Sequence, residues 1–195
     1  VIEAVAARVA LPISVDTSKP EVMRAAVAAG AGLINDVRAL RLPGALAAAR
    51  EAAVPICLMH MRGEPGTMQQ EPSYGDVVAE VADFLRDRVR ACVQAGIPRE
   101  RLLVDPGFGF GKTLAHNLAL LAGLPALSAL DLPVIVGLSR KSMIGALTGR
   151  EVDERLAGSL AAAVLAVERG ALVVRVHDVA PTVDALRVVQ ALRGD

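Results

Sequence analysis

Short apolar runs alternate with longer stretches of helical spacing along most of this chain. Each run is continuous rather than alternating between apolar and polar residues, which is typical of parallel strands covered on both faces. The repeated alternation of strand and helix predicts an α/β fold. The predicted strands lie at 12–15, 33–34, 55–59, 102–104, 134–138 and 171–174.

Helices are predicted between these strands from apolar spacing and from start and stop signals. Ser18 is expected to cap a helix that has Pro20 in its first turn and ends at Gly30. Pro125 is expected to break the helix that contains it. A polar loop is predicted over 61–73. The predicted helices are 1–9, 20–29, 43–53, 74–95, 116–129, 154–169 and 181–192.

Polar and charged residues follow the carboxyl end of all six predicted strands, which favours a (β/α)8 barrel. A doubly wound sheet is the alternative, but it would concentrate chemistry at one switch point. A barrel has eight strands and about 250 residues, whereas this pattern supplies about six. We therefore interpret 1–195 as one TIM barrel domain present as about six βα units and incomplete at the N-terminus. Open strand edges near Ile13 and Val173 lead us to expect poor solubility, or a swapped oligomer, and no turnover by this stretch alone.

Composition narrows the functional classes. The chain has 195 residues, of which 53% are hydrophobic, and its formal net charge is zero. A core of this size excludes disorder, and the lack of a basic tract or a long apolar run predicts no nucleic-acid or membrane partner. Cys57 and Cys92 form no C-x-x-C pair, which predicts reduced thiols in a cytoplasmic protein. The three lysines, Lys19, Lys112 and Lys141, each follow a predicted strand.

A glycine-rich loop follows the predicted strand at 102–104 and begins with a carboxylate, in Asp-Pro-Gly-Phe-Gly-Phe-Gly-Lys over 105–112. It is not a phosphate loop, because Pro106 stands where that motif needs glycine, and Lys112 likewise breaks the dinucleotide pattern. Glycines there allow positive φ and a close approach of the backbone to a ligand.

In a barrel, the strand exits bring several candidate side chains together. Arg175 is suited to a bidentate phosphate contact. Asp105 and Asn35 offer acceptors and donors that suit a fused heterocycle, and Phe110 could cover a ring face. The candidates at the strand exits are Asp16, Asn35, Met59, Asp105, Ser139, Lys141, Arg175 and His177.

Several of these residues have other interpretations. Asp16 could cap a helix and Asn35 could satisfy a turn. For His60 we prefer the role of a satisfied core histidine. Ser139 resembles a nucleophile elbow but lacks its last glycine, so a hydrolase serine is rejected. Lys141 could form a Schiff base, and the residues alone leave that open.

Six segments, in order along the whole chain, resemble those of dihydropteroate synthases. The Asp105 loop together with Ser139–Ser142 is specific to that family within the pterin-binding barrels. The segments are Ser14–Pro20, Ile34–Asp36, Leu58–Met61, Asp105–Lys112, Gly137–Ser142 and Arg175–Asp178.

The resemblance implies a transferase of folate synthesis, which joins 6-hydroxymethyl-7,8-dihydropterin diphosphate to p-aminobenzoate and releases diphosphate. It implies Mg²⁺ as cofactor, with the family's metal-binding Asn and two mobile loops in the βα units expected before residue 1, and a homodimer when complete. Asp105, Lys141 and Arg175 are the implied catalytic residues. By motif, Asp16, Asn35, Met59, Asp105, Gly137 and Lys141 are expected to bind the pterin, Arg175 and His177 the diphosphate, and Phe110, Ser139 and Lys141 the p-aminobenzoate that sulfonamides displace.

Two alternatives accompany this interpretation. One is a non-catalytic pterin-binding fragment or paralogue. The other is a methyltetrahydrofolate:corrinoid methyltransferase, which shares the pterin barrel, although Ser139–Ser142 argues against it.

Overall fold

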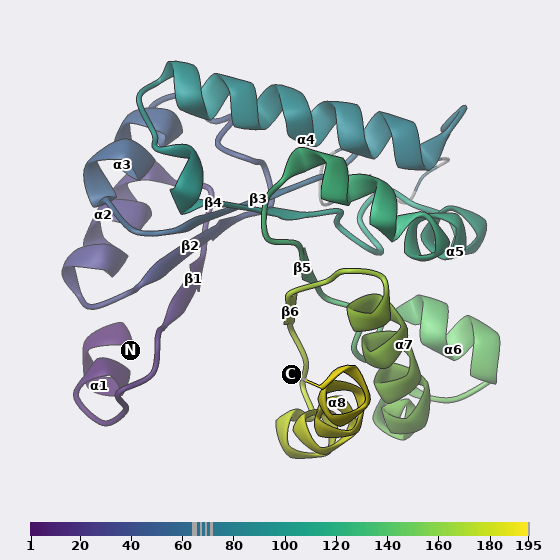
Figure 1. Ribbon diagram of the computed structural model, residues 1–195. Helices are drawn as coiled ribbons and strands as arrows, with labels where there is room; N and C mark the ends of the chain where they lie inside the picture. Colours follow the sequence, from purple (N-terminus) through teal and green to yellow (C-terminus); the bar gives the residue numbers. More distant parts are fainter. Residues whose placement is uncertain (64–65, 67, 69, 71, 195) are drawn as a thin grey trace.

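A computed structural model describes residues 1–63, 66, 68, 70 and 72–194. It confirms the predicted alternation of strands and helices, with every paired strand parallel to its neighbour (Figure 1). The predicted loop 61–73 lies partly outside the described residues. The strands are β1 Ser14–Asp16, β2 Leu33–Asp36, β3 Ile56–Met59, β4 Leu102–Asp105, β5 Ile135–Val136 and β6 Val173–Val174.

The strands form a continuous arc in sequence order. β1 to β4 make one sheet and β5 pairs with β6, while a single parallel bridge between Val104 and Val134 joins the two sheets. Within the described part of the chain, β1 pairs only with β2 and β6 only with β5. The predicted open edges of the first and last strands are therefore present.

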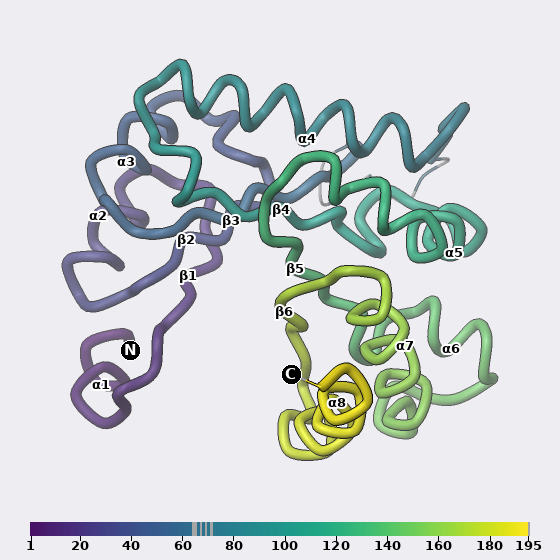
Figure 2. The backbone as a smooth tube through the Cα atoms, in the orientation of Figure 1, coloured from purple at the N-terminus to yellow at the C-terminus, as the bar shows by residue number. Residues whose placement is uncertain are grey.

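The helices cover the outer side of the arc, as the backbone trace shows (Figure 2). Short 3-10 turns extend three of the connections: η1 Arg99–Arg101, η2 Leu124–Leu130 and η3 Val152–Glu154. The α-helices are α1 Ile2–Ala6, α2 Pro20–Ala28, α3 Ala45–Ala52, α4 Val77–Gln94, α5 Leu114–Ala122, α6 Ser142–Thr148, α7 Leu156–Glu168 and α8 Val179–Arg193.

Ser18 does not cap α2, contrary to the prediction. Lys19 occupies the N-cap position without a side-chain hydrogen bond, and the Ser18 hydroxyl donates to Asp36 at the end of β2 instead. Asp36 is fully buried and also accepts from the backbone N–H of Leu40. An unpaired buried carboxylate costs more free energy than an uncapped helix end that is exposed to water. The Ser18 hydroxyl therefore donates to Asp36 and not to α2.

Helix boundaries also differ from the pattern. α1 is shorter than 1–9. The predicted helix 116–129 is interrupted near Pro125, as expected: α5 ends at Ala122, and Pro125 lies in the first turn of η2. The sequence pattern missed α6 altogether, because this helix is short and contains Gly145.

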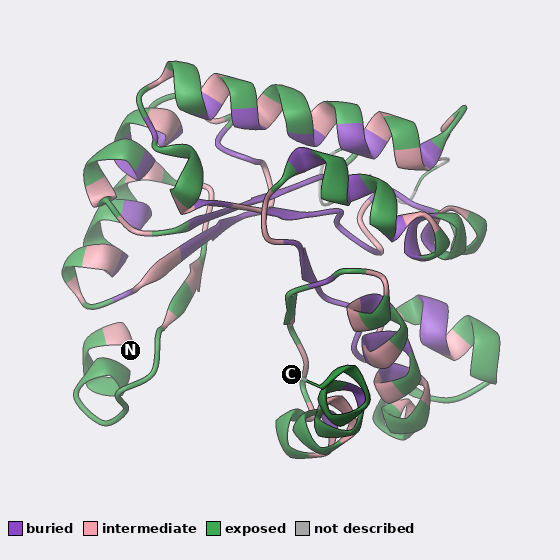
Figure 3. Ribbon diagram, in the orientation of Figure 1, coloured by how far each residue is buried: buried purple, intermediate pink, exposed green. Residues whose placement is uncertain are grey.

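The core lies between the strands and the inner faces of the helices (Figure 3). All four residues of β3 are buried, and α4 contributes an apolar face that includes fully buried Leu85. Phe108, from the glycine-rich loop, is fully buried in the same cluster. The loop that carries the candidate chemistry is therefore anchored in the core by an aromatic ring.

Both thiols are free and buried, in β3 for Cys57 and in α4 for Cys92, as predicted. Burial raises the pKa of the Cys57 thiol well above its usual value and that of Cys92 to about 11. No helix formed by the described residues combines the length and apolar character needed to cross a bilayer.

Candidate functional site

Parallel register places the polar ends of neighbouring strands side by side. Asp16 of β1 is paired with Asn35 of β2, and Met59 of β3 is paired with Asp105 of β4. The carboxyl ends of parallel strands meet at one edge, so four predicted site residues share that edge of the sheet.

Asp105, at the end of β4, is a buried acid at this edge, with 2% of its surface exposed. Its Oδ1 accepts the backbone N–H of Gly107 at 2.7 Å. Burial raises the pKa of the carboxyl, although the Gly107 N–H and the positive charges of Lys141 and Arg175 act in the opposite direction. The site therefore places an acceptor with unused oxygen capacity in a region of low polarity.

A polar chain links the first and the last strand. Asn35 Nδ2 donates to Asp16 Oδ2 at 2.8 Å, and Arg175 Nη1 lies 3.4 Å from the same oxygen. Neither a helix cap for Asp16 nor a turn for Asn35 matches these contacts, so both alternative interpretations are wrong.

Gly137 makes room for the guanidinium of Arg175. A Cβ at Gly137 would lie 3.1 Å from Arg175 Nη2. Because Gly137 has no side chain, the guanidinium of Arg175 can lie close to the backbone at the end of β5. This structural function is compatible with the predicted role of Gly137 at the pterin site.

Lys141 approaches the glycine-rich loop from the connection after β5. Its Nζ donates to the carbonyl of Phe108 and lies 4.7 Å from the centre of the Phe110 ring. Burial lowers the pKa of this amine to about 8, although Asp105 opposes that shift. Lys141 and Phe110, two of the three residues predicted for p-aminobenzoate, are thus in contact.

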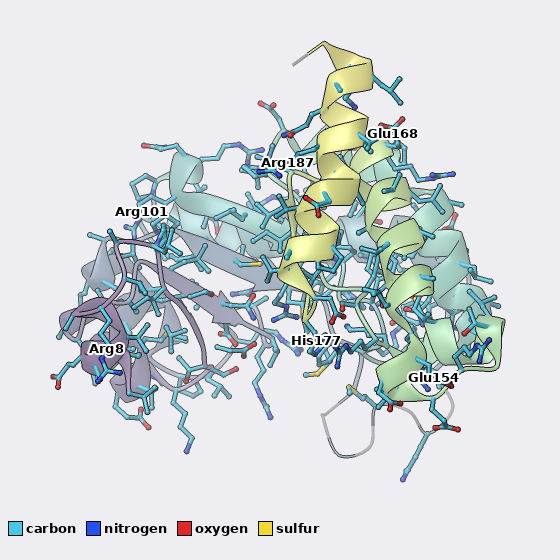
Figure 4. The ribbon with its side chains drawn as sticks, turned by 90° about the horizontal axis from the view of Figure 1, so that it is seen from below. Arg8, Arg101, Glu154, Glu168, His177 and Arg187 are labelled. Atoms are coloured by element: carbon cyan, nitrogen blue, oxygen red, sulfur yellow. The ribbon has the colours of Figure 1, made fainter. Side chains whose placement is uncertain are left out.

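Ser139 and His177 form a second polar pair. The Ser139 hydroxyl is 3.0 Å from Nδ1 of His177 and accepts the backbone N–H of the same residue at 3.2 Å. Figure 4 shows His177 at the N-terminal end of α8. A cavity of about 310 Å³ opens here, and its lining consists of Gly137, Ser139, Lys141, Arg175, Val176 and His177.

The structure therefore arranges the predicted residues in two neighbouring groups. Asp16, Asn35, Met59 and Asp105 occupy the β1–β4 edge, whereas the predicted diphosphate residues line the cavity after β5 and β6. Lys141 belongs to both, because it lines the cavity and its charge acts on Asp105.

Sequence reasoning missed the pair that supports the cavity from behind. Arg140 makes two hydrogen bonds to Asp178, at 3.0 and 2.5 Å, which lower the pKa of that carboxyl. Arg140 adopts a φ of 58°, which is rare for a side chain of this size. The two residues are 38 positions apart, so a linear pattern cannot reveal the pair.

Metal ligands do not cluster in the described ranges. No group of three or more His, Cys, Asp or Glu side chains there is placed to hold a metal ion. The described residues alone therefore do not provide a complete protein cage for Mg²⁺.

Comparison with known proteins points in one direction. Residues 1–177 match the family described as pterin binding enzyme. The dihydropteroate synthase of Escherichia coli (strain K12) is 56% identical over 191 residues, which cover 98% of this chain and 68% of the relative.

Solved structures agree with the sequence match. A Yersinia pestis dihydropteroate synthase with a sulfonamide drug complex has a TM-score of 0.97 at 49% identity, over 99% of this chain and 70% of that one. A Xanthomonas albilineans dihydropteroate synthase in complex with 7,8-dihydropteroate has a TM-score of 0.94 at 60% identity, over 100% and 71%. This similarity confirms the predicted α/β fold of the barrel type, present in six parallel strands.

The closeness of the glycine-rich loop to β3 leads to a first prediction. Gly107 and Gly149 have φ values of +68° and +67°, but a Cβ at Gly107 would lie 1.9 Å from the carbonyl oxygen of His60, whereas Gly149 faces open space. Both substitutions to alanine carry the left-handed penalty of about 1–2 kcal/mol. Gly107→Ala should destabilise the fold well beyond this, as measured by denaturant unfolding. Equal losses for the two variants would contradict the loop geometry.

Proposed function

Since this chain belongs to the pterin-binding enzyme family and, within it, to the dihydropteroate synthases, we propose that it serves the family's transfer reaction in folate synthesis. That reaction joins 6-hydroxymethyl-7,8-dihydropterin diphosphate to p-aminobenzoate, forming 7,8-dihydropteroate and diphosphate. The chain spans 68% of the length of the E. coli relative. The observation that carries the proposal is the buried carboxylate of Asp105 beside a cation-lined cavity.

Asp105 is proposed to bind the pterin. The ring N–H and the amino group of a pterin are donors, and a carboxylate offers two oxygens to them. One oxygen of Asp105 already accepts the Gly107 N–H, which fixes the orientation of the group. Asn35, Met59 and Asp16 extend the same edge, with Asn35 donating to Asp16. An apolar, weakly hydrated setting strengthens each of these contacts.

Arg175, with His177, is proposed to hold the diphosphate. Charge gathers on the leaving diphosphate as its C–O bond breaks, so a cation at this position stabilises the transition state more than the ground state. Arg175 lies at the cavity mouth with about half of its side chain exposed. Its Asp16 contact is long at 3.4 Å, and an incoming phosphate could replace it.

Lys141, Phe110 and Ser139 are proposed to flank p-aminobenzoate. Lys141 lies over the Phe110 ring, so the loop face carries both an aromatic surface and a cation for a benzoate ring and its carboxylate. An arylamine is a neutral nucleophile at pH 7 and needs no strong general base. Competition by sulfonamides at this position is part of the proposal.

The proposed reaction needs no Schiff base on Lys141, because the arylamine is itself the nucleophile. Mg²⁺ is proposed as a companion of the diphosphate. Mg²⁺ is commonly bound through one or two carboxylates together with substrate phosphates. The described residues supply no set of three protein ligands for it. The cytoplasmic location stays a prediction.

A homodimer is also part of the proposal. Leu118 of α5, Leu147 of α6 and Leu165 of α7 are large apolar side chains with 40%, 54% and 44% exposure. They line an apolar hollow of about 250 Å³ between these helices. Such a surface is expected to be covered by a second copy. Sedimentation velocity should show a dimer that Leu147→Glu dissociates, and a dimer that survives Leu147→Glu would count against this surface.

Binding and turnover test the proposed function separately. Titration calorimetry on the 195-residue chain should detect the pterin diphosphate. Dihydropteroate formation should then be assayed both on this chain and on a version extended to the length of the relatives. The non-catalytic alternative predicts binding without turnover by the extended version. If neither version binds the pterin, the proposed function is wrong.

Asp105→Asn should weaken pterin binding. The amide offers one oxygen where the carboxylate offers two, and an unpaired buried donor costs about 1–3 kcal/mol. We expect a loss of affinity of about tenfold or more by calorimetry. Asp87→Asn, on the exposed face of α4 where Asp87 pairs with Arg90, is the matched control. Unchanged affinity in Asp105→Asn would remove this residue from the site.

Arg175→Lys should weaken diphosphate binding although the formal charge is kept. The ammonium lacks the planar fork that bonds two phosphate oxygens at once. The measurement is the affinity for inorganic diphosphate, with Arg187→Lys as the control, since Arg187 pairs with Asp184 on the exposed side of α8 (Figure 4). Equal affinities for the wild type and Arg175→Lys would show that Arg175 is not the clamp.

A further inference from the structure

Lys112 is a buried lysine that the proposed chemistry does not use. It ends the glycine-rich loop and has 3% of its surface exposed. Its Nζ lies 2.9 Å from Nδ1 of His60, 2.9 Å from the carbonyl oxygen of Gly107 and 3.2 Å from that of Phe110. All three partners are neutral.

Burial of the Lys112 ammonium among neutral acceptors is unfavourable in free energy. An ammonium has three N–H donors, and here each faces one acceptor, but removing its charge from water still costs free energy. Backbone N–H groups or a serine could tie two carbonyls together at lower cost. Loop closure alone therefore does not explain why a charged side chain is buried at this position.

We propose that Lys112 is a positioning residue for the transfer reaction: its Nζ fixes the carbonyls of Gly107 and Phe110, and its charge supports the carboxylate of Asp105. The inference rests on the function proposed above. Lys112 does not line the cavity after β5 and β6, so it acts through Asp105 and Phe110.

Other close contacts also hold the glycine-rich loop. A Cβ at Gly111 would lie 2.2 Å from the carbonyl oxygen of Arg62, so the loop backbone touches the segment after β3. The Tyr74 hydroxyl donates to the Gly111 carbonyl at 2.9 Å, and Asn117 accepts the Gly109 N–H at 2.8 Å. Lys112 joins the carbonyls of Gly107 and Phe110 to His60, the residue that follows β3.

His60 provides a rigid counterpart. It is 4% exposed, and its ring packs edge-on against Phe84 with centroids 4.9 Å apart. Burial, followed by the charge of Lys112, lowers the pKa of His60 to about 3. The prediction of a satisfied core histidine is confirmed, and its neutral Nδ1 can accept from the ammonium.

Lys112 changes its protonation state near neutral pH. Its pKa is lowered to about 7, mainly by burial; Asp105 opposes that shift, and the charges of Lys141 and Arg62 add to it. Arg41 also acts on His60, and Arg175 on Asp105. Above pH 7 the amine loses its proton, and the Nδ1–H tautomer of His60 can then donate to it. The hydrogen bonds survive while the positive charge beside Asp105 disappears.

Lys112→Met tests the proposal, because methionine keeps the length of the stem and removes the donors and the charge. The 195-residue protein is titrated with pterin diphosphate and then with p-aminobenzoate, at pH 5 to 9. We expect p-aminobenzoate affinity to fall about tenfold or more and pterin affinity to fall less at neutral pH. The acid limb of pterin binding should move to higher pH, because Lys112 lowers the pKa of Asp105.

Two further variants separate positioning from packing. Lys112→Arg keeps the charge and should restore the acid limb, even if its larger fork disturbs p-aminobenzoate affinity. Lys19→Met removes the exposed lysine that precedes α2 and should leave both affinities unchanged. Equal losses for the two ligands with an unmoved acid limb in Lys112→Met would overturn the proposal.

A ligand-free measurement keeps the proposal testable if Lys112→Met folds poorly or the wild type binds no pterin. Carbon-13 labelling at lysine Cε yields signals from only three lysines. In the wild type, the amide signals of Gly107 and Phe110 should titrate with the same midpoint as the Lys112 signal. Independent titration would overturn the positioning role. Absence of pterin binding with shared midpoints would instead count against the proposed function alone.

Discussion

A buried carboxylate at the end of a central strand is the constraint on which the site depends. Asp105 cannot stay charged at 2% exposure without compensation, and its neighbourhood supplies one backbone N–H and three cations. Each of those cations comes from a different connection, after β4, β5 and β6. The site therefore exists only when several βα units are docked together, and the parallel register aligns their exits.

Glycine and aromatic residues of the loop place the backbone N–H and the cations close to the Asp105 carboxylate. Phe108 fills the core and anchors the loop, while Gly107 lets the backbone pass against His60. The loop thus combines an apolar anchor with close backbone contact, which leaves Phe110 and the charged ends free to face a ligand. Rigidity at this level reduces the entropy lost when a substrate binds.

Sequence patterns were sufficient for the fold and for the identity of the strand-exit residues, because continuous apolar runs and terminal polar residues are local features. They failed where tertiary contacts decide. Ser18 donates to Asp36 instead of capping α2. Asp16 contacts Asn35 and Arg175 instead of capping a helix. The helix α6 forms although it contains Gly145. The sequence predicts His60 as a core histidine, but its partner Lys112 lies 52 positions away along the chain. A local sequence pattern could not identify that partner.

The contact between Asp16 and Arg175 joins residues 159 positions apart. A ribosome delivers the chain from its N-terminus, and domains assemble as their segments emerge. The strand ends of β1 to β4, where the pterin is proposed to bind, can therefore come together early in synthesis, whereas the cavity that Arg175 lines must wait for β6. Contacts of such long range also slow folding. During that interval Asp16 lacks its cationic partner, so a small cation or a cationic helper that binds there would act on a nascent chain rather than on a finished protein.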